Sequence, residues 1–306
     1  MEHLTNFSGK VLENESLSRH TYYRIGGPAR FLVEPIGMED LRIVHNFIKK
    51  HQLPYFFLGK GSNLLVSDEG FPGVVIKTQK LNTELRCSAE NVLKVGSGVA
   101  VTQLLREAGE NGWGGLEFLA GIPGSIGGVV FMNAGTHLGE VSSYVLAVEA
   151  FNFEDELFRL ERFELDVLAF QYRKNLFLKP SHFIWGLELS FTPGTPDRVR
   201  AQIKEVLDRR KSTQPLNRPS CGSVFKNPKP SGLHAWQVIE KLGLRGYQMG
   251  AAAFSEVHCN FIVNLGDAKA SDVKGLIDLA KRRAEEELGI RLEEEVQYLG
   301  YGKLLS

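Results

Sequence analysis

Two short glycine clusters constrain the fold of this chain more than any other feature. Residues 59–64 directly follow the apolar run 55–58, and residues 121–128 carry glycine at four of eight positions. A glycine loop at the end of a strand exposes backbone N–H groups and admits close approach of a ligand, so the first cluster can cradle a phosphate and the second also implies a backbone that approaches a ligand. The alternatives are a tight turn for the first cluster and close packing of a short helix for the second.

The first cluster departs from the common nucleotide-binding fingerprints. Leu64 stands where the dinucleotide fingerprint has its third glycine, and no Walker lysine–serine pair follows it. The cluster therefore indicates neither a Rossmann fold nor a P-loop. A pyrophosphate or an isoalloxazine ring suits the second cluster, because each needs several backbone donors and little side-chain bulk.

The hydrophobic pattern predicts alternating helices and strands around these loops. Periods near 3.6 predict helices over residues 38–52, 101–110, 199–211, 234–243 and 273–288. Apolar runs predict strands at 54–58, 71–77, 91–95, 145–153, 157–163, 183–191, 261–263 and 292–299. Because residues 193–196 (Pro-Gly-Thr-Pro) mark a boundary, we expect an N-terminal α/β lobe (1–70), a sheet-rich lobe (71–193) and a C-terminal α/β domain (194–306).

Charge and cysteine content narrow the class of protein. Thirty-six basic residues balance 36 acidic ones, so we expect neither a nucleic acid nor a membrane as a partner. No run approaches the roughly 20 apolar residues of a membrane span, and the three cysteines are widely spaced. We therefore expect a cytoplasmic protein with reduced thiols and no metal site. The absence of heptads predicts a monomer.

Residues 221–228 (Cys-Gly-Ser-Val-Phe-Lys-Asn-Pro) place a hydroxyl, a cation and an amide beside two residues that shape the backbone. Gly222 allows close approach to a ligand and Pro228 stops a helix, so Ser223, Lys226 and Asn227 can converge on an anionic substrate. The alternative is a turn that only solvates its polar groups. The segment is a candidate for proton delivery.

The glycine loops, preceded by residues 21–28 (Thr-Tyr-Tyr-Arg-Ile-Gly-Gly-Pro), resemble the FAD domain of UDP-N-acetylenolpyruvoylglucosamine reductases, which make UDP-N-acetylmuramate for bacterial peptidoglycan. Residues 170–173, 222–228 and 292–296 resemble the three catalytic segments of that family, and the match covers almost the whole chain. The resemblance implies an α+β fold, with a two-lobed FAD-binding domain of the vanillyl-alcohol-oxidase type and a C-terminal α/β substrate-binding domain. It also implies FAD and NADPH as cofactors and a UDP-linked amino sugar enolpyruvyl ether as substrate.

The same resemblance assigns flavin binding to the residues of the glycine loops and of the Met-Asn-Ala-Gly segment that follows. These residues are Gly59, Gly61, Ser62, Asn63, Leu64, Gly121, Pro123, Gly124, Ser125, Ile126, Gly127, Asn133 and Gly135.

By position in the family's motifs, Ser223 corresponds to the proton donor, and Arg173 and Glu295 to the pair that assists at the enolpyruvyl carboxylate and enol. A guanidinium grips a carboxylate bidentately, and a serine hydroxyl placed against a carbanion-like carbon can protonate it. The alternatives are a surface cation for Arg173 and a solvated strand residue for Glu295. Tyr172, Lys226 and Asn227 are candidate substrate contacts, with loop or packing roles as alternatives.

The chain also departs from the family pattern. Glu294 stands where the family often has proline, which keeps Glu293 open as the acid instead of Glu295. Residues 173–196 are too few for the tyrosine-bearing substrate loop of one branch, so the chain resembles the branch without it. Lys211 and Arg218 are then candidates for the diphosphate.

Three competing functions remain to be weighed. Related flavin oxidases predict a C-terminal domain without the Ser223 and Glu295 segments and often a histidine that tethers the flavin, whereas His137 only follows the second loop. Acyl transfer would pair Cys221 or Ser223 with His258, although no GxSxG motif surrounds Ser223. A flavin-binding module without catalysis would need no acid, base or arginine at the site.

Overall fold

The structure, a computed structural model that describes residues 4–302, divides into two compact units that interleave along the chain. The first unit comprises the chain up to Leu12, Phe31–Lys60 and Gly73–Arg210. The second comprises Glu13–Arg30, Gly61–Pro72 and the chain from Lys211 onward. The lobe boundaries expected at residues 70 and 193 stay predictions.

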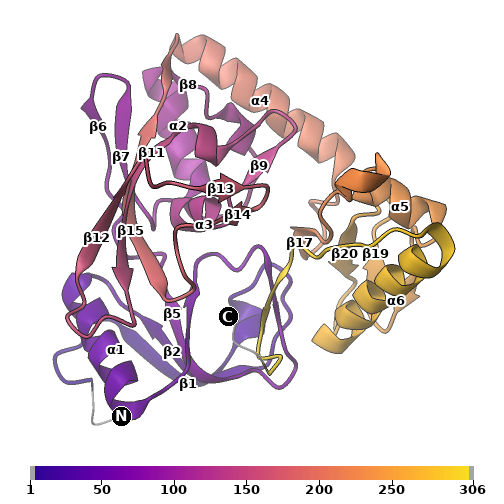
Figure 1. The fold of residues 1–306 in the computed structure, drawn as a ribbon, viewed down its shortest axis with the longest axis horizontal. Helices are drawn as coiled ribbons and strands as arrows, with labels where there is room; N and C mark the ends of the chain where they lie inside the picture. The colour runs from indigo at the N-terminus through magenta and orange to yellow at the C-terminus, as the bar shows by residue number, and fades with distance from the viewer. Residues whose placement is uncertain (1–3, 303–306) are drawn as a thin grey trace. The chain divides into compact units, whose positions relative to one another are not determined.

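An antiparallel five-stranded sheet is the centre of the first unit (Figure 1). Its strands, in spatial order, are β12 (Leu160–Glu164), β11 (Val145–Asn152), β15 (His182–Ser190), β7 (Val92–Gly96) and β6 (Leu85–Ala89). Helices α2 (Val101–Asn111) and α3 (Ile126–Phe131) share one buried apolar core with the central strands. Burying this face provides most of the driving force for the unit, because apolar area removed from water is the dominant favourable term in folding.

Strand β3 (Tyr55–Leu58), which pairs in parallel with β5 (Phe71–Lys77), carries the chain into the first glycine loop. These two strands belong to a four-stranded sheet of order β1-β2-β5-β3, in which β1 spans Lys10–Ser16 and β2 spans Pro28–Glu34. Helix α1 (Met38–His51) shares an aromatic-rich core with the β3 side of this region. The predicted helix, strand and loop order is therefore confirmed here.

Gly112 ends α2. Its φ of +73° is left-handed, and its N–H bonds to the carbonyl of Ala108. An added Cβ would lie 2.2 Å from the carbonyl oxygen of Gly194, so only glycine fits this helix end.

The second unit contains a four-stranded antiparallel sheet of order β17-β20-β19-β18. The strands span Ser220–Ser223 (β17), Phe261–Asn264 (β20), Ala252–Phe254 (β19) and Gln248–Met249 (β18). Helices α5 (Ala235–Lys241) and α6 (Ala270–Leu288) share its apolar core. A parallel pair, β4 (Leu64–Val66) and β21 (Gln297–Leu299), joins the segment after the first glycine loop to the C-terminal part of the chain.

The predicted strand over residues 292–299 is wrong in its first half. Only Gln297–Leu299 forms a strand, and Glu294 makes an isolated bridge to Phe225. In this half, Glu293 forms an ion pair with Lys226, and the Glu294 carboxylate lies 2.8 Å from Lys281 of α6. Residues 293–295 form a ladder with the 224–226 segment before the chain turns to pair with β4.

The remaining elements are short or connect these layers. They are η1 (Leu17–Arg19), β8 (Trp113–Gly114), η2 (Glu117–Leu119), β9 (Gly135–Thr136), β10 (Gly139–Glu140), η3 (Val141–Ser143), β13 (Phe170–Gln171), β14 (Lys174–Asn175), β16 (Thr192–Pro193), α4 (Pro196–Thr213) and η4 (Lys229–Ser231). Across residues 4–302, every helix is too short or too polar to cross a membrane.

Candidate active site

Ser223 lies at the end of β17, directly after a bulge in the strand. Ser220 pairs with Val263 and Ser223 with Phe261, and the register shifts between these two pairs. Gly222 supplies the bulge with a φ of +82°, while no atom lies within 4 Å of where its Cβ would be. The backbone conformation therefore requires glycine there, and the bulge sets the direction in which the next residue, Ser223, points.

The chain after Ser223 is held on both sides by backbone hydrogen bonds. On one side, the Val224 N–H donates to the carbonyl of Asn260 at 2.8 Å. On the other, the Glu295 N–H donates to Val224 and the Lys226 N–H donates to Glu293, both at 2.8 Å. The structure thus brings the Ser223 and Glu295 segments together in one ladder.

Glu295 is also linked to the first glycine loop. The Asn63 side-chain amide donates to the Glu295 carbonyl at 2.9 Å, and the Gln297 N–H donates to the Asn63 carbonyl at 3.0 Å. Leu64 follows as the buried first residue of β4, in register with Gln297. Two predicted flavin-binding residues, Asn63 and Leu64, therefore also place Glu295.

The two predicted substrate contacts next to Ser223 have partners in the protein. Lys226 forms an ion pair with Glu293, whose side chain is 73% exposed. The Asn227 side-chain oxygen accepts the N–H of Ala235, the first residue of α5, at 3.0 Å. Asn227 therefore has a helix-capping role, in keeping with the packing alternative.

Arg173 lies at the tip of a two-residue hairpin in the first unit, between β13 and β14. Its φ is +59°, an uncommon conformation for a residue other than glycine, asparagine or aspartate. Its guanidinium lies 5.0 Å from the ring centroid of Tyr172, within the range of a cation–π contact. The half-buried, strained position argues against an ordinary surface cation.

Asn133, a predicted flavin-binding residue, holds this hairpin in place. Its buried side-chain amide donates to the Gln171 carbonyl at 2.9 Å, and its oxygen accepts the Ser142 N–H at 3.2 Å. From the hairpin, the Asn175 amide donates to the Phe131 carbonyl at 2.7 Å. The end of the second glycine region is thereby connected to the residue that precedes Tyr172 and Arg173.

The second glycine loop lies against residues 97–101. Gly127 donates to the Ser97 carbonyl at 3.0 Å, and Ile126 donates to Val99 at 2.9 Å. A Cβ on Gly127 would lie 2.8 Å from the Cβ of Ser97, so this glycine is explained by packing. A Cβ on Gly59 would lie 3.0 Å from the Ser125 hydroxyl, which places the start of the first loop beside the second.

The other predicted flavin residues fall into the same loops. Gly61 has a φ of +61°, and its carbonyl accepts the Tyr22 N–H at 3.0 Å; Gly121 has a φ of +77°. Ser62 and Pro123 are half-buried, Gly124 is buried, and Gly135 begins β9.

Beside Gly127, the buried Ser97 hydroxyl makes no hydrogen bond with any residue of the 4–302 range. A buried hydroxyl without a protein partner next to a glycine loop fits a polar cofactor group at this place. Sequence reasoning missed Ser97, although it lies between two glycines, Gly96 and Gly98, directly after a predicted strand.

The thiol route to acyl transfer is disfavoured by the environment of Cys221. Burial raises the pKa of this thiol to about 12, so almost none of it is thiolate at neutral pH. The ring of His258 accepts the Asn260 N–H through Nδ1 at 3.3 Å, and burial lowers its pKa. In the described part of the chain, no group of three histidine, cysteine or acidic side chains is placed to hold a metal ion.

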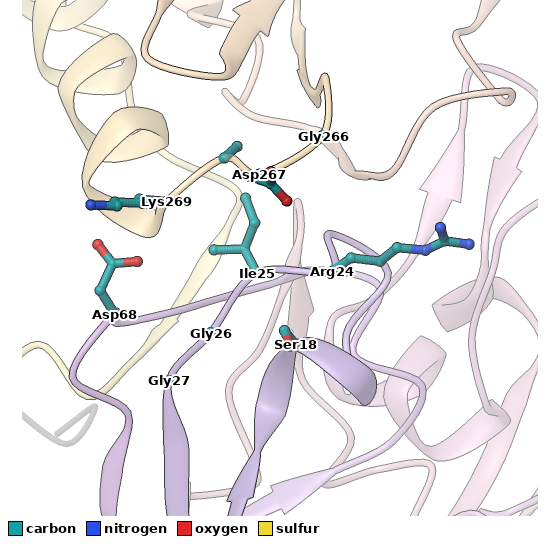
Figure 2. A pocket seen from close by; sticks show the side chains of 10 residues that line it. Ser18, Arg24, Ile25, Gly26, Gly27, Asp68, Gly266, Asp267 and Lys269 are labelled. Carbon is teal, nitrogen blue, oxygen red and sulfur yellow. The ribbon is translucent and has the colours of Figure 1, made fainter.

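A hollow of about 280 Å³ in the second unit contains none of the predicted site residues (Figure 2). Its lining includes Ser18, Arg24, Gly26, Asp68, Gly266 and Lys269. The Asp68 carboxylate already accepts the Ala270 and Ser271 N–H groups at 2.7 and 3.0 Å at the start of α6. The hollow is therefore a capped helix end with mixed charges.

Two family models match this chain. Residues 29–161 match the family model of an FAD binding domain, and residues 214–299 match that of the UDP-N-acetylenolpyruvoylglucosamine reductase C-terminal domain. The UDP-N-acetylenolpyruvoylglucosamine reductases of Bacillus subtilis strain 168 and Halalkalibacterium halodurans are 42% and 41% identical to this chain, over 95% of both sequences in each case.

The chain belongs to the UDP-N-acetylenolpyruvoylglucosamine reductase family. The crystal structure of the family member from Thermus caldophilus matches with a TM-score of 0.77 and 35% identity, covering 95% of this chain and 98% of that one. The predicted α+β fold, with an FAD-binding domain and a C-terminal domain, is confirmed. So are FAD as the cofactor and the class of enzyme, a flavin-dependent oxidoreductase.

Proposed function

We propose that this reductase converts UDP-N-acetylglucosamine enolpyruvate to UDP-N-acetylmuramate, a precursor of peptidoglycan, with NADPH as the reductant and Ser223 as the proton donor. The observation that carries the proposal is the ladder in which Val224 joins the Ser223 segment to Glu295. The ladder brings the segment that carries a hydroxyl beside the segment that carries an acid, although the two come from opposite ends of the C-terminal domain. Such a pair suits protonation of a carbon.

The glycine loops are the proposed FAD site. Residues 59–64 and 121–127 would hold the cofactor, and the Ser97 hydroxyl and the end of the second region at Asn133 lie beside the second loop. When bound, FAD supplies the hydride that it has received from NADPH. The protein's task is then to bind the enolpyruvyl ether, orient its double bond and deliver one proton.

The reaction adds one hydride and one proton across the carbon–carbon double bond. With the hydride on the terminal carbon, negative charge develops on the neighbouring carbon and its carboxylate. Arg173 would bind that carboxylate, and Ser223 would transfer its hydroxyl proton to the carbanion-like carbon. The serine alkoxide left behind would take up a proton from solvent before the next turnover. Substrate leaves as the saturated lactyl ether, and NADPH leaves as NADP⁺.

Glu295 is the better candidate than Glu293 for the assisting acid. Glu293 is 73% exposed and forms an ion pair with Lys226. Glu295 is half-buried, and its backbone bonds to both Val224 and Asn63.

We assign the substrate contacts to Tyr172, Lys226 and Asn227. We also expect a monomeric cytoplasmic enzyme. Three free thiols suit a reducing compartment.

An anaerobic absorbance experiment tests the proposal. NADPH should bleach the flavin of the purified holoenzyme, and UDP-N-acetylglucosamine enolpyruvate should restore the colour without oxygen. In Ser223→Ala, bleaching by NADPH should persist, while reoxidation by substrate should fall roughly 10²–10⁴-fold. A flavin that stays reduced until air enters would indicate an oxidase, and unchanged reoxidation in Ser223→Ala would remove the serine from the mechanism.

A further inference from the structure

A buried asparagine, Asn260, holds the main chain directly after Ser223. Asn260 is only 4% exposed and lies directly before β20. The Asn260 Oδ1 accepts the Phe225 N–H at 3.0 Å, and Nδ2 donates to the Phe225 carbonyl at 2.8 Å. The Asn260 backbone carbonyl accepts the Val224 N–H at 2.8 Å. One residue therefore engages three main-chain groups immediately beyond the proposed proton donor.

The carboxamide acts here as a replacement for a neighbouring strand. A side-chain amide presents one acceptor and one donor with the geometry of a peptide group, so it can close the same paired hydrogen bonds as a residue in an antiparallel ladder. β17 ends at Ser223, and backbone pairing with β20 ends there as well. Asn260 continues that pairing for two more residues.

The opposite edge of the same segment carries Glu295. Glu295 donates to the Val224 carbonyl, and Lys226 donates to Glu293. Phe225 is thus held by Asn260 from one side and bridged to Glu294 on the other. Release of Phe225 on the Asn260 side would let the segment move, and the register between Ser223 and Glu295 would move with it.

We infer that Asn260 is a positioning residue for proton delivery, which acts by keeping the Ser223 hydroxyl in register with Glu295. The inference rests on the proposed role of Ser223. A displacement of about 1 Å at a reacting group can lower a rate 10²-fold, so loss of this clamp should slow the step that uses the serine proton. Flavin reduction by NADPH does not use that proton and should be spared.

The same chain segment offers a matched control, Asn264. It is 3% exposed and lies four residues further along, in β20. Its carboxamide also bonds only to main chain among the described residues: Nδ2 donates to Tyr23 at 3.0 Å, and Oδ1 accepts from Gly266 and Ala268 at 2.8 and 3.2 Å. Asn264→Ala therefore removes a comparable buried amide whose side-chain hydrogen bonds, as the described residues show them, do not involve residues 223–226.

The experiment compares Asn260→Ala and Asn264→Ala as FAD-loaded proteins. The rates of flavin reduction by NADPH and of anaerobic reoxidation by UDP-N-acetylglucosamine enolpyruvate are measured separately. We expect both variants to lose stability and to keep the reduction rate. Reoxidation should fall roughly 10–100-fold in Asn260→Ala only. If Asn260→Ala does not fold, Asn260→Ser, whose hydroxyl can still accept a hydrogen bond, replaces it in the same comparison.

Two further readouts separate positioning from general loosening. In a Ser223→Ala background, Asn260→Ala should slow reoxidation of the flavin by substrate only a little further, because both changes act on the same step. Amide hydrogen exchange over residues 223–226 should be faster in Asn260→Ala and unchanged in Asn264→Ala, since only the former exposes the Phe225 N–H.

The outcomes distinguish this inference from the proposed function. If substrate does not reoxidise the flavin of the unmodified enzyme, the proposed function fails. If it does, and Asn260→Ala behaves as Asn264→Ala in reoxidation, the positioning role is overturned. The positioning role would also be overturned if the effects of Asn260→Ala and Ser223→Ala on the free energy of activation for reoxidation were fully additive in the double variant.

Discussion

At the scale of single residues, the site relies on backbone conformations that side chains rarely adopt. Arg173 sits at a φ of +59° and Gly222 at +82°, each at or next to a proposed catalytic group. A side chain in the left-handed region costs roughly 1–2 kcal/mol relative to a helical or extended conformation. Such strain persists only where surrounding contacts maintain it, and the hairpin of Arg173 is held by Asn133 and Asn175.

We predict that Arg173→Gly is more stable than Arg173→Ala by roughly 0.5–1 kcal/mol, although both are equally impaired in turnover. Both variants lose the same side-chain contacts, so their difference isolates the cost of a Cβ at this φ. Urea denaturation of the two proteins measures it. Equal stability, or a more stable alanine variant, would show that the hairpin relaxes away from the left-handed conformation.

At the scale of elements, helix α1 is fastened by aromatic packing around a histidine. His45 is 1% exposed, and its ring lies 5.2 Å from that of Phe153 and 4.8 Å from that of Phe158. Neither ring nitrogen has a hydrogen-bond partner within residues 4–302. Burial lowers the pKa of His45, because a charged imidazolium in this apolar core lacks solvation.

Because the pKa of His45 is lowered in the folded protein, the contribution of this residue to the free energy of unfolding depends on pH. The unfolded chain takes up a proton on His45 near pH 6.5, whereas the folded protein does so only at lower pH. Stability is therefore fully present above about pH 6.5 and is lost as pH falls below it. We predict that His45→Phe loses less stability than the unmodified protein between pH 7 and pH 5, measured by chemical denaturation.

A second substitution separates this titration from packing. His45→Ala should also lose less stability on acidification, but it should be roughly 2–4 kcal/mol less stable than the unmodified protein at pH 8 because of the cavity it leaves. If both variants kept the full acid dependence, its origin would lie in other groups.

At the scale of the whole molecule, the FAD-binding domain and the C-terminal domain each contribute part of the proposed chemistry. Arg173 and the second glycine loop belong to the first compact unit, and Ser223 and Glu295 belong to the second. A ligand that binds only the folded state adds its binding free energy to stability. FAD should therefore report on the folding of its domain as well as on catalysis.

We predict that FAD at about 100 times its Kd stabilises the apoprotein by roughly 2.7 kcal/mol, seen as a rise of several degrees in the melting temperature. Riboflavin, which lacks the pyrophosphate, should give a smaller rise. Ser97→Ala should leave the apoprotein at least as stable, because it removes a buried hydroxyl that has no hydrogen-bond partner among residues 4–302, but should reduce the shift caused by FAD. An unchanged FAD shift would exclude Ser97 from the cofactor site.

The sequence by itself determined helices α1, α2, α4, α5 and α6, several of the longer strands and the motif segments, but it did not predict α3, β1 or β2. Periodicity placed α1, α2 and α6 to within a few residues, because the buried face of an amphipathic helix appears in the sequence as apolar residues that recur every three or four positions. Glycine patterns located both loops, since few other residues tolerate those backbone angles. Family resemblance in these local motifs was enough to indicate the cofactor and the class of reaction.

Only the tertiary structure decided which polar groups meet. Asn63 reaches Glu295 across 232 positions, Asn133 holds the hairpin of Arg173, and Asn260 replaces a strand beside Phe225. A carboxamide bonds equally well to solvent, to a ligand or to any backbone group, so the hydrogen-bond partner of an asparagine cannot be predicted from the sequence. The predicted strand at residues 292–299 was wrong in its first half for a related reason. The conformation there depends on backbone hydrogen bonds with the distant residues 224–226 and not on local strand propensity.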